Sequence, residues 1–85
     1  MLIGINKPKP VLISETYQAE YRIENEKAEF VKYIGNEDEY EVPAHIDGYP
    51  VTRIGKYAFA GSKELESLII VANEIEIGEK AFMGC

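Results

Sequence analysis

The residues that could do chemistry in this chain are few, and their spacing fits no catalytic or metal-binding motif. His45 is the only histidine and Cys85 the only cysteine, so neither a zinc site with several His or Cys ligands nor an internal disulfide can form. A nucleophilic triad would need a serine beside His45 and Asp47, but no nucleophile elbow surrounds any candidate serine. The candidates are Ser14, Ser62 and Ser67. We therefore expect no catalytic residue, and we expect His45 to be a polar turn residue.

A glycine-lysine pair, Gly55-Lys56, follows Gly48 and invites comparison with a phosphate-binding loop. Such a loop has four residues between its glycines and a Ser or Thr after the lysine. Here six residues separate Gly48 from Gly55, and Tyr57 follows the lysine. No G-x-G-x-x-G motif occurs either, so the sequence predicts no nucleotide or other cofactor.

Two groups of acidic residues could be taken for calcium ligands or paired catalytic carboxylates. One is Glu37-Asp38-Glu39, and the other comprises Glu74, Glu76 and Glu79. Neither fits the D-x-[DN]-x-[DN]-G pattern of a calcium loop, and acids in extended or turn regions commonly form solvated faces. We expect both groups to keep the protein soluble and to hold no metal.

The composition narrows the class of protein. The 85 residues include nine basic and fifteen acidic side chains, which give a formal net charge of −6 and argue against a nucleic-acid partner. The longest apolar run is five residues, Leu68 to Ala72, far short of the ~20 that a transmembrane helix needs. The amino terminus lacks the apolar segment of a signal peptide. We expect one small domain, no membrane insertion, and a cytoplasmic location for the chain as given.

The first part of the chain has the pattern of β-structure. Residues 1–16 contain two closely spaced prolines, which predict an extended arm. Apolar and polar residues alternate from Tyr17, as in a half-buried strand, and residues 28–34 return as the second strand of a hairpin. Phe30 and Val31 have opposite parity, so either the register of that strand is not fixed by the pattern or the strand carries a β-bulge.

The carboxy-terminal half contains an internal repeat. Residues 54–62 recur at 77–85, where five of nine positions are identical and the offset is 23 residues. A fixed period of this length is typical of a solenoid, in which each unit buries its apolar side against its neighbours. Residues 63–72 are rich in helix formers, but the repeat predicts a turn and then a strand from Leu68 to Val71, and we follow the repeat.

The two I-G-x-x-A-F-x-G segments, with L-x-x-L-x-I between them, resemble the BspA-type leucine-rich repeat, a bacterial and protozoal variant of that superfamily. The stretch from Tyr33 to Gly55 looks like the family's entry unit. The resemblance implies a mainly β fold: a short right-handed leucine-rich-repeat solenoid of about two coils, with an amino-terminal β-hairpin cap and short helical turns. It divides the chain into an extended arm (1–16) and one repeat domain (17–85), which comprises a capping hairpin (17–34), a first coil (35–61) and a second, incomplete coil (62–85).

Packing arguments accompany this resemblance. We expect Ile54 and Ile77 to point inward, and Phe59 and Phe82 to stack as a ladder in which Phe59 is better buried because a coil lies on each side of it. Small alanines beside the phenylalanines let adjacent coils approach at sheet spacing, roughly 4.8 Å. Two glycines bracket each turn, where a positive φ or a close backbone approach excludes a Cβ. They are Gly55 and Gly61 in the first coil, and Gly78 and Gly84 in the second.

Six tyrosines and no tryptophan occur in the chain. We expect Tyr17, Tyr21 and Tyr33 to belong to the core of the hairpin. The other three lie on predicted turns or strand ends, where tyrosine supplies adaptable contact area. The predicted partner-binding residues are Tyr40, Tyr49, Tyr57, Ile69 and Val71.

Two functional hypotheses follow. The first is a non-enzymatic protein–protein interaction module that presents a small leucine-rich-repeat sheet surface to a protein partner, a hypothesis that rests largely on the resemblance in fold. The alternative is a small acidic inhibitor or decoy that blocks a basic site on another macromolecule and is steered there by its charge. Added salt should lower the binding affinity of a charge-steered decoy steeply, but it should change the affinity of an apolar contact little.

The second coil is expected to end in an open edge. Open strand edges and apolar faces favour association, so we expect the isolated chain to form a homo-oligomer, most simply a two-fold dimer. The predicted self-association edge comprises Ile69, Val71, Phe82, Met83 and Cys85, with a Cys85–Cys85 bond under oxidising conditions. If the chain is a fragment of a longer family member, the resemblance implies a cell-surface or secreted location instead.

Overall fold

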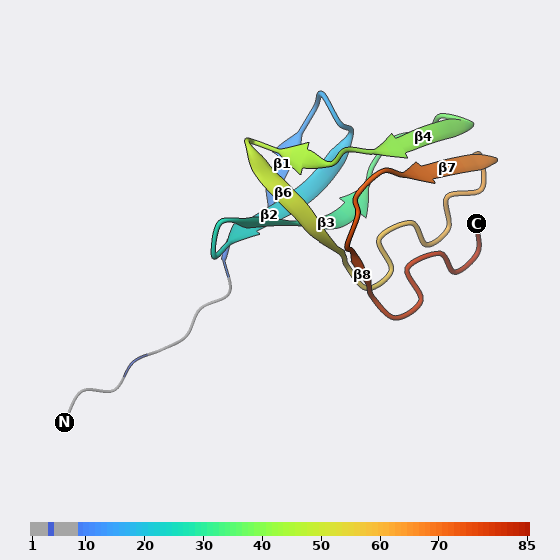
Figure 1. The fold of residues 1–85 in the computed structure, drawn as a ribbon. Helices are drawn as coiled ribbons and strands as arrows, with labels where there is room; N and C mark the ends of the chain where they lie inside the picture. Colours follow the sequence, from blue (N-terminus) through green and yellow to red (C-terminus); the bar gives the residue numbers. More distant parts are fainter. Residues whose placement is uncertain (1–3, 5–8) are drawn as a thin grey trace.

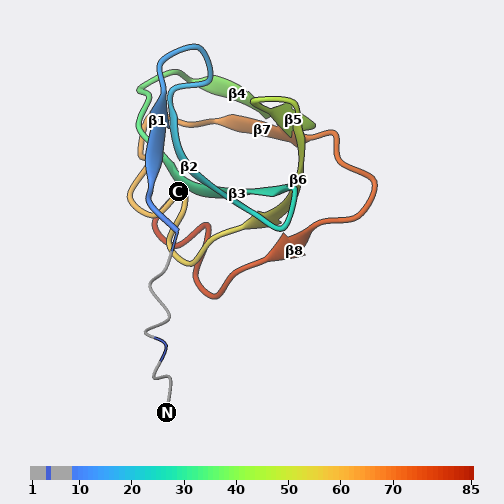
Figure 2. The ribbon, with the colours of Figure 1, turned by 90° about the vertical axis from the view of Figure 1, so that its left-hand side faces the viewer.

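The computed structural model describes Gly4 and residues 9–85, and every regular element in that part of the chain is a β-strand (Figure 1). The strands are β1 (Leu12–Ser14), β2 (Ala19–Glu24), β3 (Lys27–Tyr33), β4 (Glu39–Val42), β5 (His45–Ile46), β6 (Tyr49–Ile54), β7 (Ser67–Ile70) and β8 (Glu76–Ile77). One sheet has the order β1-β2-β3-β6-β5, with β8 also paired to β6, and a second sheet consists of β4 and β7. Figures 1 and 2 show β4 and β7 side by side on one side of the molecule, with β3, β6 and β8 on the other. The mainly β prediction is confirmed.

The amino-terminal strands form an antiparallel meander against the repeats. β1 pairs with β2, and β2 pairs with β3 across a tight turn at Asn25 and Glu26. These two residues have φ values of 52° and 59°, as a two-residue hairpin turn requires. The predicted hairpin is therefore present. Within the predicted 1–16 arm, Leu12–Ser14 is the strand β1, whereas residues 1–3 and 5–8 lie outside the described residues.

The irregularity expected in the second hairpin strand is a β-bulge. The β2–β3 register shifts where Tyr21 pairs with Phe30, so Val31 is skipped. A bulge changes which residues of a strand share a face. As a result Phe30 and Tyr33, which differ in parity, are both buried in the core.

Parallel pairing joins the predicted first coil (35–61) to the hairpin on one side and to the predicted second coil (62–85) on the other. β3, β6 and β8 form one ladder, in which Ile54 of β6 pairs with Phe30 on one side and with Ile77 on the other. β4 and β7 form a second ladder, which ends at the pair Val42–Ile70. The strand predicted from Leu68 to Val71 is thus present as β7 but begins and ends one residue earlier, so Val71 lies just after it. Pairing with the neighbouring coil outweighs a weak local preference for helix.

The expected short helical turns are absent from the described residues, and this part of the prediction is wrong. In residues 55–62 alternate amides close local turns, whereas the amides between them donate to carbonyls of the second coil at 2.7–3.3 Å. The inter-coil bonds run from the N–H groups of Tyr57, Phe59 and Gly61 to the carbonyls of Glu79, Ala81 and Met83. A helix needs consecutive amides bonded within its own segment, so these turns cannot be helical while they stack.

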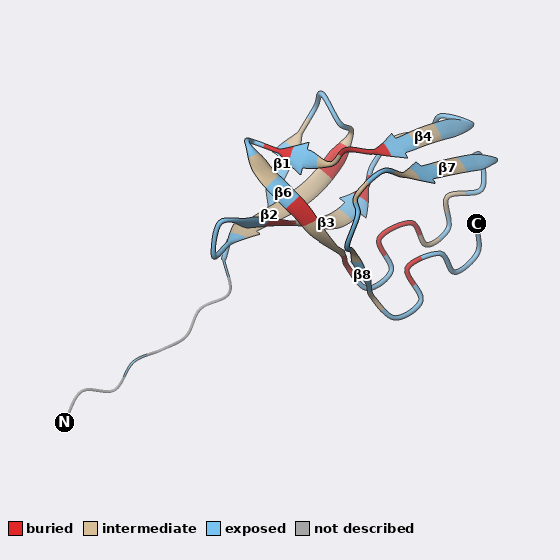
Figure 3. Ribbon diagram, in the orientation of Figure 1, coloured by how far each residue is buried: buried red, intermediate tan, exposed pale blue. Residues whose placement is uncertain are grey.

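An aromatic stack forms the centre of the core. The rings of Phe30, Phe59 and Phe82 are stacked, with centroid distances of 5.1 Å and 5.6 Å between neighbours. Phe59 is fully buried and Phe82 is 36% exposed, which confirms the predicted ladder and its order. Figure 3 shows buried positions in both turn segments as well as in β3 and β6. The sequence did not predict Phe30 as a member of the ladder, because it does not follow the 23-residue period.

The repeated glycines serve two different purposes. Gly61 and Gly84 each have a φ of 75°, a conformation that favours glycine. Gly78 has no such φ, but a Cβ on it would lie 2.6 Å from the backbone nitrogen of Lys56.

Two expectations about burial need correction. Tyr17 is exposed rather than part of the hairpin core, and Ile77 is 48% exposed, because none of the described strands covers β8 on its outer side.

Candidate interaction surface

The side chains that could do chemistry are dispersed over the fold. His45 is exposed on β5, Ser14 lies on β1, and Ser67 lies on β7 in the other sheet. In the part of the chain that the structure describes, no group of three or more His, Cys, Asp or Glu side chains is arranged to hold a metal ion.

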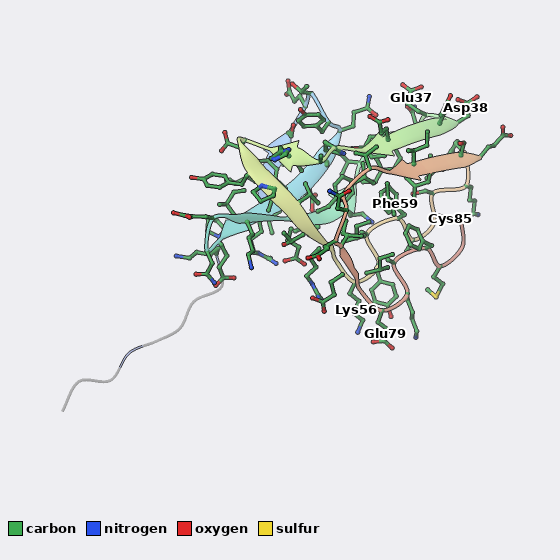
Figure 4. All side chains as sticks on the ribbon, in the orientation of Figure 1. Glu37, Asp38, Lys56, Phe59, Glu79 and Cys85 are labelled. Atoms are coloured by element: carbon green, nitrogen blue, oxygen red, sulfur yellow. The ribbon has the colours of Figure 1, made fainter. Side chains whose placement is uncertain are left out.

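The acidic groups singled out from the sequence take part in contacts between structural elements. The N–H of Glu37 donates to the hydroxyl of Tyr33 at 3.0 Å, and the carbonyl of Asp38 accepts two N–H groups of the second coil at 2.7 Å and 3.0 Å. Glu79 lies 3.7 Å from Lys56 of the first coil, and Figure 4 shows these two side chains next to each other at the edge of the turns.

Glu76 belongs to a row of alternating charges that crosses four strands. The row comprises Arg22, Glu29, Arg53 and Glu76, with closest N–O distances of 3.2 Å, 3.6 Å and 2.5 Å between successive members. The hydrogen bond and charge of Glu76 raise the pKa of Arg53 further, which keeps this guanidinium charged. Such cross-strand pairs of opposite charge favour the observed register of the sheet.

The five predicted partner-binding residues are not brought together. The ring of Tyr40 packs against those of Phe30, Tyr33 and Phe59, and its hydroxyl donates to the carbonyl of Tyr17 at 2.5 Å. Burial, together with the nearby tyrosines, raises the pKa of the Tyr40 hydroxyl well above its usual range. Tyr40 is therefore chiefly a structural residue.

Tyr49 and Tyr57 lie apart from each other. Tyr49 is half-buried against the core at the start of β6. Tyr57 is exposed on the turn of the first coil, where the ammonium of Lys56 lies 5.3 Å from the centroid of its ring. Of the predicted set, only Ile69 and Val71 lie close together in one segment. Ile69 lies on β7, and Val71 directly follows that strand.

The β4–β7 sheet has one face on the core and one outer face that is exposed. Alternate residues of both strands point away from the core, which pairs Glu39 with Ser67 and Glu41 with Ile69 on that surface. We call these four residues the outer β4–β7 face. Sequence reasoning placed Glu39 on a solvated face but did not consider Glu41, although the alternation in Glu39-Tyr40-Glu41-Val42 could have identified both as neighbours on this face.

The predicted self-association edge consists of exposed residues of the second coil. Ile69, Val71, Phe82 and Met83 are exposed, and so is Cys85, whose thiol donates to the carbonyl of Phe59 at 3.2 Å. Phe82 contacts Phe59 with one face of its ring.

Two further observations concern the chain, one from its structure and one from its sequence. No helix in its described part is long and apolar enough to cross a membrane. The sequence matches no protein-family model and no curated protein.

Comparison with solved structures identifies the fold. A leucine-rich repeat protein of T. pallidum (TpLRR) is similar with a TM-score of 0.77 and 25% identity, over 87% of this chain and 36% of that one. A leucine-rich cell surface protein of Faecalibacterium prausnitzii is similar with a TM-score of 0.62 and 21% identity, over 94% of this chain and 29% of that one. The chain thus spans about a third of the length of these solved chains. It has the leucine-rich repeat fold, in agreement with the BspA-type resemblance of its two I-G-x-x-A-F motifs.

Proposed function

We propose that this chain is a non-enzymatic protein-interaction module and that the outer β4–β7 face meets the partner. The observation that carries the proposal is the 43% exposure of Ile69 on a sheet whose other face packs on the core, with Val71, 45% exposed, directly after the strand. Large apolar side chains held on a rigid sheet beside carboxylates are suited to bind another protein. The similarity to two leucine-rich repeat proteins supports the same class of function.

The chemistry of this face indicates what its partner must offer. Ile69 pairs with Glu41 across the two strands, so an apolar position lies directly beside a carboxylate. A complementary partner would place an apolar side chain over Ile69 and a basic side chain next to Glu41. Burial of Ile69 would supply most of the affinity, and the charges would mainly set orientation and the association rate.

Selection from a displayed random-peptide library on the immobilised chain tests the proposal. We expect enriched peptides whose binding weakens about tenfold or more in the Ile69→Glu variant, because interface anchors carry most of the binding energy. Ile13→Glu is the matched control, since Ile13 is an exposed isoleucine on β1, an edge strand of the other sheet. Enriched peptides that bind both variants alike would overturn the assignment of the face, and no enrichment at all would overturn the function.

Salt dependence separates this function from that of an acidic decoy. Apolar contacts are weakly sensitive to ionic strength, whereas attraction between exposed charges is screened beyond about 8 Å at physiological salt. We expect the affinity of the selected peptides to fall only a few-fold between about 0.05 M and 0.5 M salt. A much steeper loss would instead favour the decoy.

We also propose that the 85-residue chain self-associates through the exposed side of its second coil. Phe82 and Met83 lie on adjacent positions of the turn, and β8 offers its outer edge to a further strand. Sedimentation equilibrium at micromolar concentration, with reductant present, should show a dimer that Met83→Glu dissociates. A monomer in both proteins would contradict this proposal and leave the interaction with a partner unaffected.

A further inference from the structure

A groove between the two coils arises from a difference in their lengths. Across the β4–β7 ladder, Ser67 follows its partner Glu39 by 28 residues, whereas across the β6–β8 ladder Glu76 follows Arg53 by 23. The first coil therefore contains five more residues between its two ladders than the second coil. The extra residues form the β5–β6 hairpin, whose tight turn lies at Asp47 and Gly48, with φ values of 55° and 82°.

This hairpin and residues 71–74 of the second coil form the two walls of the groove, which has a volume of about 460 Å³. Pro50 and Ala44 contribute apolar surface from the hairpin wall, and Val71 and Ala72 contribute it from the other. His45 and Glu74 are among the polar side chains of the lining. We call this feature the hairpin groove.

The backbone along the groove is available for hydrogen bonding. The inter-coil ladder stops at Val42–Ile70 and resumes at Arg53–Glu76. Between these points Ala72, Asn73 and Glu74 make no backbone–backbone hydrogen bond within the described part of the chain. Extended peptides are recognised by backbone groups of this kind, with adjacent pockets selecting their side chains.

The charge of the groove favours a basic ligand. Glu74 forms no ion pair with another described residue, unlike Glu76 and Glu79 of the same coil. A neighbouring hollow shares Glu74 and adds Glu76 together with one cation, Lys27. Since the whole chain carries a net charge of −6, approach of a basic segment is favoured over that of an acidic one.

We propose that the hairpin groove binds an extended segment of a partner protein in which a small apolar residue is followed by Lys or Arg. The apolar side chain lies between Pro50 and Val71, the basic side chain pairs with Glu74, and the segment's backbone bonds to residues 72–74. This rests on the proposed function, because it names the kind of partner that the interaction module takes. Binding in the hairpin groove would extend the contact surface from Ile69 past Val71 to the base of the β5–β6 hairpin.

Two pools of random octapeptides provide the probe, one with a fixed central Val-Lys pair and the other with Val-Glu. The full chain should retain the Val-Lys pool about tenfold better, as a charge-assisted contact to one carboxylate allows. Glu74→Gln should abolish this preference. Glu64→Gln should keep it, because Glu64 is an exposed acid of the same coil that lies outside the groove. Ala72→Trp should block binding of the pool by filling the groove.

The outcomes distinguish this proposal from the function on which it rests. If the unrestricted library yields peptides sensitive to Ile69→Glu, while the Val-Lys preference is missing or survives Glu74→Gln, the groove proposal is wrong and the interaction function stands. If neither library yields binders, both are wrong. A change in sedimentation on Ala72→Trp, with unchanged circular dichroism, would show that the groove holds a second copy of the chain and would overturn the proposed ligand.

Discussion

The two coils carry the same motif but differ sharply in how well they bury it. Ile54 and Phe59 of the first coil are fully buried, whereas their counterparts Ile77 and Phe82 are 48% and 36% exposed. The motif alanines are buried in both coils. The comparison shows that the alanine position is buried without a coil on its outer side, whereas the isoleucine and phenylalanine positions depend on a neighbour on both sides.

The largest expected difference between the coils concerns the two phenylalanines. Phe59 stacks on a ring on each side and is fully buried, so Phe59→Ala should cost about 3–5 kcal/mol of unfolding free energy. Phe82 stacks on one side only, and Phe82→Ala should cost about 1–2 kcal/mol, because less area leaves water when it folds. Urea titration of both variants measures the difference.

A destabilised Phe59→Ala protein could be mostly unfolded, because small domains have little stability to lose. Phe59→Leu keeps most of the buried volume and retains enough folded protein for a titration. Equal losses for Phe59→Leu and Phe82→Leu would contradict the order of burial in the stack.

For the motif glycines, unlike the phenylalanines, we expect the larger loss of stability in the second coil. A Cβ on Gly78 would lie 2.6 Å from the backbone nitrogen of Lys56 and 2.7 Å from the carbonyl carbon of Gly55, and neither atom can move freely. A Cβ on Gly55 would lie 2.9 Å from the end of the Glu29 side chain, which can rotate away, and 3.4 Å from the nearest backbone atom. Gly78→Ala should therefore cost about 2–3 kcal/mol and Gly55→Ala about 1 kcal/mol or less.

Thermal unfolding followed by circular dichroism ranks these two variants. Gly61→Ala serves as the control for backbone strain without a clash, because Gly61 has a positive φ but open space around its Cβ position. If Gly55→Ala lowered the melting temperature as much as Gly78→Ala, the explanation of the Gly78 effect by close contact with the backbone of the first coil would be wrong.

The repeat was visible in the sequence because it preserves residue identities at fixed spacing. That spacing predicted the strand at β7, the stacking of Phe59 on Phe82 and the sites of the turn glycines. It could not predict the role of Phe30, which reaches the same stack from the hairpin through a bulge at Val31 and not through the period.

The surface was harder to predict than the core. Tyr40 looked like a contact residue because it lies near a polar turn, but its ring belongs to the aromatic cluster of the core. The helical turns were wrong because alternate amides bond to the next coil, a choice that depends on the neighbouring coil and not on local sequence. The hairpin groove depends on the unequal lengths of the coils, which only the pairing of both ladders reveals.

A third difference between the coils is their response to alkaline pH. In the first coil Tyr40 lies opposite Leu68 of the second, so only the first coil places an ionisable group at this position of the core. Burial raises the pKa of Tyr40 above its unfolded value, so folding favours the protonated form. The stabilisation is complete below the unfolded pKa of about 10 and is lost as the pH rises above it.

Urea midpoints at pH 8 and pH 11 test this pH dependence. The wild type should lose more stability between the two pH values than Tyr40→Phe, which has no hydroxyl to ionise. At pH 8 the unfolding free energy of Tyr40→Phe should be about 1 kcal/mol lower than that of the wild type, because the carbonyl of Tyr17 loses its hydrogen bond. Tyr57→Phe is the matched control, because it removes the hydroxyl of a tyrosine that lies exposed on the turn. Identical pH dependence in all three proteins would show that Tyr40 is not the group responsible.

The smallest expected effect concerns the charge row that joins the coils. Glu76→Gln removes the partner of Arg53 at the outermost strand, where the Glu76 side chain is largely exposed and that of Arg53 is partly exposed, so it should cost less than about 1 kcal/mol. Arg53→Gln should cost slightly more, because Arg53 also lies 3.6 Å from Glu29. Both losses should shrink toward zero in about 1 M salt, where the screening length falls to about 3 Å. Urea titrations at low and high salt measure this, and a loss that persists at high salt would mean that the row stabilises the coils by packing rather than by charge.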